Sequence, residues 1–373
     1  MPTAKECRVF RVPMANPGDT SAIEALIDDG RIVAADIVAI FGKTEGNGCV
    51  NDFTRPYAVE ALKSALAPRL GIGSGDVPGR VHLVMSGGTE GALSPHFLVF
   101  AVQQTAAPPT LAGVKRLAIG AAATPDFAAE EIGRLPQIYA TAEAVGRAMA
   151  EAGIASAADV HFVQIKCPLI TAQRHAAAVA HGARPAAHDT YASMALSRGA
   201  SALGVGLALG EIDAGELSDE TVCRDYRLWS GQASASAGIE LLHSEVIVLG
   251  NSAKWAGDLV VGHAVMQDAL DLAAAETALR MVGIDAGRQL TAAQRRRVAA
   301  VMVKAEASAD GRVRGKRHTM LDDSDIHATR HARAFVGGAV AALIGFTDIF
   351  VSGGAEHQGP DGGGPVAVIA TAT

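Results

Sequence analysis

Three lysines, each followed along the chain by a serine in a glycine-rich block, are the residues best suited to chemistry. The serine blocks are Ser86-Gly87-Gly88-Thr89-Glu90, Ser236-Ala237-Gly238-Ile239-Glu240 and Ser352-Gly353-Gly354-Ala355-Glu356. Upstream of each block a lysine ends an apolar run with strand character; these are Lys43, Lys166 and Lys304. A candidate arginine lies between each lysine and its serine, namely Arg55, Arg198 and Arg330. The order Lys, Arg, Ser therefore occurs three times, which indicates an internal repeat.

These residue types suit the binding and attack of a carbonyl compound. The serine hydroxyl is accessible beside small residues, and the next peptide N–H, of Gly87, Ala237 or Gly353, can donate to a carbonyl oxygen. Three such subsites around one axis would match a small, flat ring with alternating carbonyl and N–H groups. Arginines would add fixed donors, and a lysine deprotonated by burial and neighbouring cations would be the base for serine attack.

One lysine differs from the other two in its surroundings. Glu45 and Glu306 lie two residues after Lys43 and Lys304, whereas Pro168 follows Lys166 at this spacing. Residues two apart face the same side of a strand, so each glutamate would tend to keep its lysine protonated. We therefore expect Lys166 to lose its proton most easily and Ser236 to be the nucleophile.

The elements around these residues predict an α/β fold. A second strand-like apolar run follows each serine block, at residues 97–101, 246–249 and 366–370. Helices are expected at 141–152 and at 266–281. We predict three similar α/β repeat domains around a pseudo-threefold axis, with the active site at the centre. The units are 1–104, 112–250 and 256–373, separated by the turn-rich segments 105–110 and 250–258.

Composition excludes several classes of protein. The 373 residues are 49% hydrophobic but only 4% aromatic, so the core must consist of small aliphatic side chains. A net charge of −7 argues against a nucleic-acid or membrane-surface partner. The four cysteines are far apart, and neither a membrane-length apolar run nor a signal peptide is evident, which favours a cytoplasmic protein.

Three segments resemble the cyanuric acid hydrolase/barbiturase family, and are closer to the cyanuric acid hydrolases: residues 41–52, 85–91 and 351–360. The resemblance implies one Ser/Lys dyad per domain, with Lys166 as base and Ser236 as nucleophile of the catalytic dyad. It implies hydrolytic opening of the s-triazine ring of cyanuric acid to carboxybiuret, which loses carbon dioxide to give biuret. The remaining residues of the repeat map to substrate binding: Lys43, Arg55, Ser86, Gly87, Arg198, Ala237, Lys304, Arg330, Ser352 and Gly353.

The same resemblance implies a structural magnesium ion, no organic cofactor and a homotetramer. The ion would order the Ser352 loop, because exposed carbonyls of a Gly/Pro-rich loop and one carboxylate suit a hard cation. The implied ligands are Glu306 and oxygens of Ala355, Gln358, Gly359, Pro360 and Gly363.

Two other functions remain open at the level of sequence. A barbiturase would share the architecture and act on a ring in which a methylene replaces one N–H. A non-catalytic binder of cyclic imides would use the same three subsites without turnover. An amidase of the Ser-cis-Ser-Lys type would leave the threefold repetition unexplained.

Overall fold

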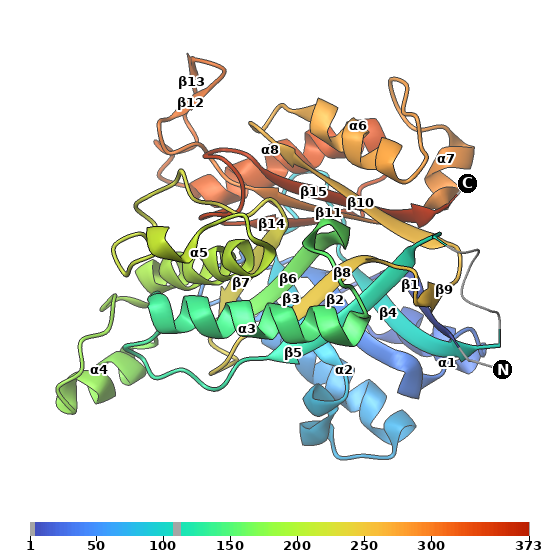
Figure 1. Cartoon of the computed structure of the whole chain (residues 1–373), viewed down its shortest axis with the longest axis horizontal. Coiled ribbons are helices and arrows are strands. Elements are labelled where there is room, and N and C mark those ends of the chain that lie inside the picture. Colours follow the sequence, from blue (N-terminus) through green and yellow to red (C-terminus); the bar gives the residue numbers. More distant parts are fainter. Residues whose placement is uncertain (1–3, 107–112, 373) are drawn as a thin grey trace.

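Three β-sheets with the same strand order form the framework of the protein (Figure 1). The computed structural model describes residues 4–106 and 113–372. The sheet orders are β3-β2-β4-β1-β9, β7-β6-β8-β5 and β14-β11-β15-β10. Within the repeated four strands, the first two of each order are parallel and the other pairs are antiparallel. The predicted arrangement of three similar α/β units is therefore confirmed.

The first unit begins with β1, which lies between β4 and β9 in its sheet. Its elements are β1 (Ala4–Pro13), α1 (Ser21–Asp28), β2 (Ile37–Thr44), α2 (Thr54–Leu70), β3 (His82–Gly87) and β4 (His96–Thr105). The sheet is extended by β9 (Trp255–Ala256), which pairs with β1 although it lies between the second and third units in sequence. This crossing strand ties the first unit to the rest of the chain.

The second unit carries an additional helix. Its elements are β5 (Arg116–Ala123), α3 (Leu135–Ala152), β6 (Val160–Pro168), α4 (Ala172–Ala180), α5 (Thr190–Leu209), β7 (Ala233–Gly238) and β8 (Glu245–Ser252). Helix α4 contributes to the longer interval between Lys166 and Ser236, for which the sequence predicts an insertion or a longer helical excursion.

The third unit forms the C-terminal part of the protein. Its elements are β10 (Leu259–Met266), α6 (Leu272–Met281), α7 (Ala292–Arg297), β11 (Val298–Ala305), β12 (Arg312–Val313), β13 (Lys316–Arg317), α8 (Ala328–Ile344), β14 (Phe350–Gly353) and β15 (Gly364–Thr371). Strands β12 and β13 form a small hairpin apart from the sheet.

The central strand of each unit carries an irregularity at the same place. The register shifts where β2, β6 and β11 begin to pair with β4, β8 and β15, and the shifts start at Ile37, Val160 and Val298. Each shift begins six residues before the lysine of its unit. A β-bulge twists its strand locally and re-aims the side chains that follow. The shared bulge therefore gives the three lysines equivalent positions on their sheets.

The centre of the molecule is apolar beneath the lysine and serine ends of the strands. Strand β6 is buried along its whole length, including its polar residues His161, Gln164 and Lys166. Phe41 of β2 packs against Phe100 of β4 and Phe350 of β14, with ring centroids 4.8 and 5.9 Å apart. The contact between Phe41 and Phe350 joins the first and third units across this core.

Most of the elements expected from sequence are confirmed, and one is wrong in part. The six apolar runs form β2, β4, β6, β8, β11 and β15, and the helix expected at 141–152 is the C-terminal part of α3. The helix expected at 266–281 begins only at Leu272, because Met266 ends β10 and Asp271 caps α6 by accepting from Ala274 N. Of the turn expected at 105–110, residues 107–110 lie outside the described residues.

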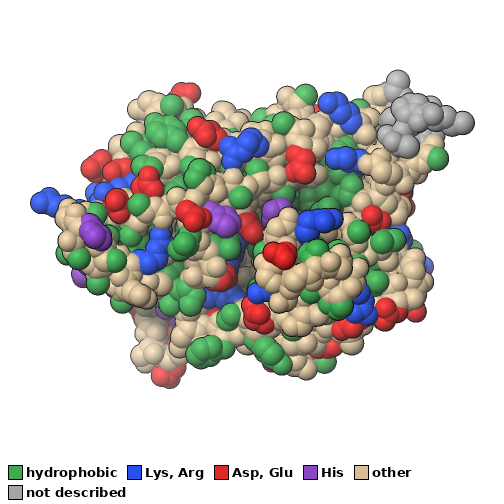
Figure 2. Space-filling model, turned by 90° about the horizontal axis from the view of Figure 1, so that it is seen from below, with side chains coloured by type: hydrophobic (Ala, Val, Ile, Leu, Met, Phe, Trp, Pro, Cys, Tyr) green, Lys and Arg blue, Asp and Glu red, His purple; other side chains and the backbone are tan. Residues whose placement is uncertain are grey.

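Helix α5 is both long and apolar. Among the described residues it is the one helix long and apolar enough to span a membrane, yet most of it is buried inside the protein. It packs against α3 and β7, so its apolar residues belong to the core of the second unit. Charges of both signs are interspersed on the face of the molecule shown in Figure 2.

Candidate active site

The parallel strand pair of each unit places its lysine beside its serine. The register aligns Lys43 with Ser86, Lys166 with Ser236 and Lys304 with Ser352. All six residues are at most 8% exposed. Side chains at paired positions of neighbouring strands project on the same face of a sheet. Three equivalent Lys/Ser pairs therefore arise from one backbone arrangement repeated three times.

The pairs of the first and third units share one hydrogen-bond pattern. Lys43 Nζ donates to Ser86 Oγ (3.1 Å) and to the Gly87 carbonyl (2.9 Å). Lys304 Nζ donates to Ser352 Oγ (3.2 Å) and to the Gly353 carbonyl (3.2 Å). Both lysines thus fix their serine and the turn that follows it.

Lys166 of the second unit has different partners. Its Nζ lies 2.7 Å from Glu240 Oε1, where the other two lysines bind a serine hydroxyl. It also donates to the Met85 carbonyl (3.2 Å), which is equivalent to the Ala235 carbonyl that accepts from Lys304 Nζ (2.8 Å). Ser236 Oγ donates weakly to the Ile165 carbonyl, at 3.5 Å. Of these three lysines, Lys166 is therefore the one whose Nζ contacts a carboxylate directly.

The three serines meet at one small cavity. It is lined by Gly48, Arg55, Ser86, Gly87, Met194, Arg198, Ser236, Ala237, Arg333, Ser352 and Gly353. The structure thus brings together every serine, adjacent small residue and arginine that the sequence singled out, apart from Arg330. The lysines lie directly behind the serines and are almost fully buried.

The third arginine of the cavity is Arg333, and the sequence did not identify it. Arg333 is 3% exposed and reaches the cavity, whereas the Arg330 side chain is 38% exposed and lines an adjoining outer pocket with Tyr191 and His327. Both arginines are on α8, but Arg330 is in its first turn, near the rim, and Arg333 is almost one turn further into the protein. The arginine expected at the cavity is thus replaced by its neighbour on the same helix.

Two glutamates of the serine blocks hold arginines from neighbouring units. Arg333 of the third unit donates through Nε to Glu90 Oε2 of the first unit (2.8 Å), and its Nη2 also contacts Glu90. Arg198 of the second unit donates to both oxygens of Glu356 of the third unit, at 2.8 and 2.6 Å. Such forked pairs fix a guanidinium in one orientation. They therefore hold two arginines at the cavity wall.

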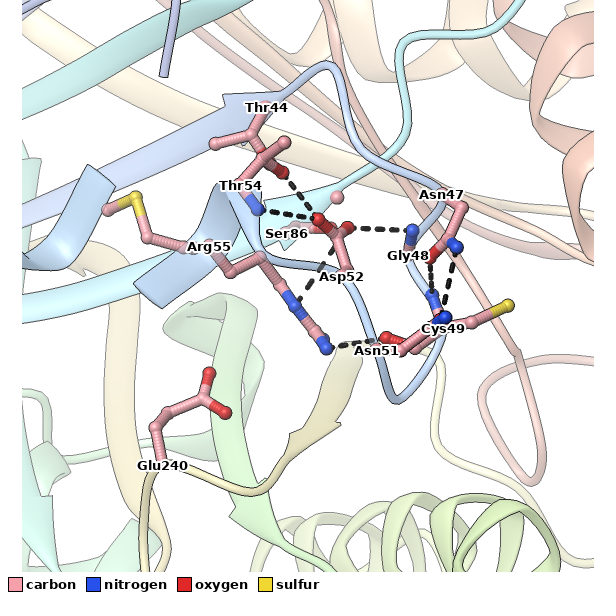
Figure 3. Close-up of polar contacts among 12 residues, drawn as sticks. Thr44, Asn47, Gly48, Cys49, Asn51, Asp52, Thr54, Arg55, Ser86 and Glu240 are labelled. Atoms are coloured by element: carbon pink, nitrogen blue, oxygen red, sulfur yellow. Dashed lines mark hydrogen bonds and ion pairs between the residues drawn. The ribbon is translucent and has the colours of Figure 1, made fainter. Parts of the chain in front are cut away.

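Arg55 is held by the loop that precedes α2 (Figure 3). Its Nη2 donates to the Cys49 carbonyl (2.7 Å), and its Nε lies 4.0 Å from Asp52 Oδ2. Its Nη1 reaches the Ala237 carbonyl of the second unit, at 3.3 Å. Asp52 is itself bound by Gly48 N, at 2.8 Å. Arg55 therefore binds the end of β7 after Ser236 and is not paired with Glu240.

Burial lowers the pKa of all three lysines, but to different extents. Burial, with a contribution from Arg333, holds the pKa of Lys43 well below its usual value. Burial and the nearby Arg198 lower the pKa of Lys304 to about 7. Burial also lowers the pKa of Lys166, but the charge of Glu240 opposes this effect.

The expectation that Lys166 stands apart by lacking a neighbouring carboxylate is therefore wrong. On the strand that carries each lysine, Pro168 does stand where the other two units have a glutamate. In the folded chain Glu240 comes from the serine block after β7 and reaches Lys166, while Glu45 lies exposed at the surface. Lys166 remains distinct from the other lysines, but because it has a carboxylate partner.

The residues expected to bind a cation occupy one tight loop and the strand end beside it. Glu306 follows β11, and burial together with the charge of Glu356 raises the pKa of its carboxyl group. Between β14 and β15 the loop closes through the bonds Gln358 N to Ala355 O (2.9 Å) and Gly363 N to Pro360 O (2.8 Å). The loop also packs against Ser308, close to Glu306, through Gly362.

The chemistry of this donor set fits a hard cation. A buried carboxylate with a raised pKa, close to a second buried carboxylate, is stabilised by a neighbouring positive ion. No three His, Cys, Asp or Glu side chains cluster within residues 4–106 and 113–372, so backbone oxygens would supply most ligands. The Gln358 side chain is already engaged, since its Oε1 accepts from Ala235 N (2.7 Å). This bond ties the loop to β7, directly before Ser236.

Comparison with known proteins relates this site to a defined family. Residues 8–371 match the family described as amidohydrolase ring-opening proteins. A cyanuric acid amidohydrolase of Enterobacter cloacae is 56% identical over 366 residues, which cover 98% of this chain and 99% of the relative. That of Azorhizobium caulinodans is 55% identical and covers 100% of this chain and 99% of its own.

Solved structures agree in fold over the whole chain. A cyanuric acid hydrolase described as an evolutionary innovation by structural concatenation superposes with a TM-score of 0.94 at 53% identity, covering 99% of this chain and 100% of its own. The crystal structure of the A. caulinodans enzyme gives a TM-score of 0.90 at 54% identity, with 99% of each chain covered. With three Lys/Ser pairs around one cavity and full-length matches of this kind, the chain belongs to the family of ring-opening amidohydrolases.

Proposed function

We propose that the protein is a cyanuric acid amidohydrolase that opens the s-triazine ring by serine attack. The observation that carries this proposal is the convergence of three Lys/Ser pairs, in identical register, on one small polar cavity. Cyanuric acid has three carbonyl groups alternating with three ring nitrogens, so each serine and adjacent peptide N–H can hold one carbonyl. The names of the relatives, which share 53–57% of their residues with this chain, support the same substrate.

The proposed reaction begins with attack of Ser236 Oγ on a ring carbonyl carbon. Lys166, as the neutral amine, takes the hydroxyl proton while the carbonyl oxygen becomes an oxyanion. Peptide N–H groups at the cavity wall and the fixed arginines stabilise this negative charge. As the oxyanion collapses, the ring C–N bond breaks and the Lys166 ammonium returns its proton to the departing ring nitrogen.

Water then hydrolyses the ester on Ser236 to release carboxybiuret, which loses carbon dioxide to give biuret. The contact with Glu240 distinguishes Lys166 from the other two lysines, and it would stabilise the ammonium that forms when the neutral Lys166 amine takes the Ser236 proton. Lys43 and Lys304 already donate to their own serines and adjacent carbonyls, which supports a binding role for those pairs.

Parallel rate measurements on cyanuric and barbituric acids test the proposed substrate. We expect kcat/KM for cyanuric acid, followed by biuret release, to exceed that for barbituric acid by at least tenfold. A subsite built to pair with an N–H is left unpaired by a methylene, which costs about 1–3 kcal/mol. Faster opening of barbituric acid would identify a barbiturase, and tight binding of both rings without any product would identify a binder.

We further propose a structural magnesium ion held by Glu306 and by oxygens of Ala355, Gln358, Gly359, Pro360 and Gly363. When bound, the ion would neutralise the Glu306 carboxylate and fix the loop between β14 and β15. The chain itself then transmits this order, because Gln358 Oε1 accepts from Ala235 N in β7, directly before Ser236.

Removal of the metal should lower stability before it affects any chemistry. We expect EDTA to lower the midpoint of thermal unfolding by several degrees, and added Mg²⁺ to restore it, because a ligand that binds only the folded state stabilises it. Glu306→Gln should have a lower midpoint than the parent protein and should lose most of its response to EDTA. An EDTA response that persists in full in Glu306→Gln would contradict this site.

The predicted homotetramer and cytoplasmic location stay predictions. Sedimentation at several protein concentrations measures the first of these independently of activity.

A further inference from the structure

The glutamates of the three serine blocks occupy equivalent positions but have unequal partners. Glu90 of the first unit pairs with Arg333 of the third, and Glu356 of the third unit pairs with Arg198 of the second. By the same rule Glu240 of the second unit would pair with Arg55 of the first. Figure 3 shows Glu240 separate from Arg55, and Glu240 instead lies 2.7 Å from Lys166 Nζ.

Two local features cause this break in the threefold pattern. Arg55 lies in the first turn of α2 and is bound to the Cys49 carbonyl beside Asp52, so its guanidinium is engaged elsewhere. The backbone of the serine block also differs. Gly88 and Gly354 have φ values of 106° and 77°, in the left-handed region, whereas Gly238 does not adopt a positive φ.

The backbone difference decides which group packs on this glycine. A Cβ added to Gly88 or Gly354 would meet the guanidinium of Arg333 or Arg198, each at 2.5 Å. A Cβ on Gly238 would instead meet Glu240 Oε2, at 2.0 Å. The carboxylate of Glu240 therefore folds back over Gly238 and faces Lys166, where the other two units place an arginine.

We propose that Glu240 is the positioning residue of the Lys166/Ser236 pair: its carboxylate holds Lys166 Nζ and stabilises the ammonium formed when Lys166 takes the Ser236 proton. The inference depends on the proposed ring opening by Ser236. The proton moves from Ser236 Oγ to the lone pair of Lys166 and later to the ring nitrogen, so Glu240 stays ionised throughout. Its role is comparable to that of a carboxylate that orients the base of a catalytic triad.

The charges that face this pair are consistent with an ionised Glu240. Burial raises the pKa of the Glu240 carboxyl group, but Lys166 and Arg55 outweigh burial and bring this pKa down to about 2. Around Lys166 the charged or titratable groups are Glu240, Arg55 and Cys167; of these, Arg55 lowers the pKa of the lysine and the other two raise it. Loss of the Glu240 charge must therefore lower the pKa of Lys166.

The matched test compares Glu240→Gln with Glu90→Gln, the same change at the equivalent position of the first unit. We expect Glu240→Gln to lower kcat roughly tenfold to hundredfold with little change in KM. This loss is part of the rate enhancement of about 10²–10⁴-fold that acid–base catalysis contributes. The acid limb of its kcat/KM profile should move to lower pH, because a lysine without its counter-charge becomes neutral at lower pH. Glu90→Gln should mainly raise KM, because it releases Arg333, and its acid limb should stay in place.

Gly238→Ala provides a second variant that keeps the charge but displaces it. The backbone at this position accepts a side chain, and the new methyl group can only push aside the flexible end of Glu240. We expect the same direction of change in kcat and in the acid limb as for Glu240→Gln. Unchanged pH profiles in both variants, or equal shifts in Glu240→Gln and Glu90→Gln, would overturn the proposal.

An activity-independent readout separates this inference from the proposed function. In protein labelled with ¹³C-lysine, the ε-carbon of Lys166, assigned with Lys166→Arg, should titrate at lower pH in Glu240→Gln than in the parent or in Glu90→Gln. If the parent protein failed to open cyanuric acid while this shift appeared, the proposed function would be wrong and the Glu240 contact right. An unshifted titration in a protein that opens the ring would refute the role of Glu240 alone.

Discussion

Ser236→Ala is expected to lower kcat for cyanuric acid by at least about a thousandfold, because it removes the group that forms the covalent intermediate. Ser86→Ala and Ser352→Ala each remove one hydrogen bond to a ring carbonyl, so we expect losses of about 1–3 kcal/mol, mainly as a higher KM. The three serines lie in identical register beside their lysines and are similarly buried. The series is therefore matched for position, and steady-state rates of biuret release measure it.

The same series also has an outcome that contradicts the assignment. If Ser236→Ala kept substantial turnover while Ser86→Ala or Ser352→Ala lost it, the nucleophile would belong to another unit. The hydrogen bonds of Lys43 and Lys304 to their serines would then mark the catalytic pair. Circular dichroism of each variant shows whether a loss reflects chemistry or unfolding.

Arg333→Met should have the second-largest effect, on both stability and substrate binding. The change leaves Glu90, whose side chain is only 12% exposed, without its forked partner. We expect a loss of about 3 kcal/mol in the free energy of unfolding, near the lower end of what breaking a buried pair costs. Since Arg333 also lines the cavity, KM for cyanuric acid should rise at least tenfold. Urea unfolding and steady-state kinetics measure the two effects.

Arg330→Met is the control on the same helix. Its side chain is 38% exposed, and its Nε lies 3.4 Å from Glu90 Oε1, so we expect about 0.5 kcal/mol or less, as for other exposed pairs. The double variant Arg333→Met/Glu90→Gln should recover part of the lost stability, because no uncompensated carboxylate remains. A larger loss from Arg330→Met than from Arg333→Met would place the wrong arginine at the cavity.

The sequence predicted the repeated strands because their signal is local. Each lysine ends an apolar, β-branched run that is buried on both faces, and three recurrences make coincidence implausible. The pairing of Lys43 with Ser86 and its two counterparts follows from the repeat, since equivalent residues in equivalent folds occupy equivalent places. The register in the structure agrees with this expectation.

Arg333 and Glu240 could not be predicted in the same way. The cavity arginines lie at different depths along their helices, with Arg55 in the first turn of α2 and Arg198 in the middle of α5. Spacing from the lysine therefore does not identify the arginine that faces inward. The contact of Glu240 with Lys166 depends on the backbone at Gly238, where the sequence shows a glycine in all three units.

The proposed mechanism is tested most directly by identifying the residue to which the opened substrate becomes covalently attached. Rapid acid quenching of the enzyme with cyanuric acid, followed by peptide mass mapping, should find an adduct with the mass of one whole substrate molecule, since ring opening releases no fragment before hydrolysis. The adduct should lie on the peptide that contains Ser236, and it should be absent from Ser236→Ala. An adduct on Ser86 or Ser352 in the parent protein, or turnover by Ser236→Ala at the parent rate, would contradict the assignment of Ser236 as nucleophile.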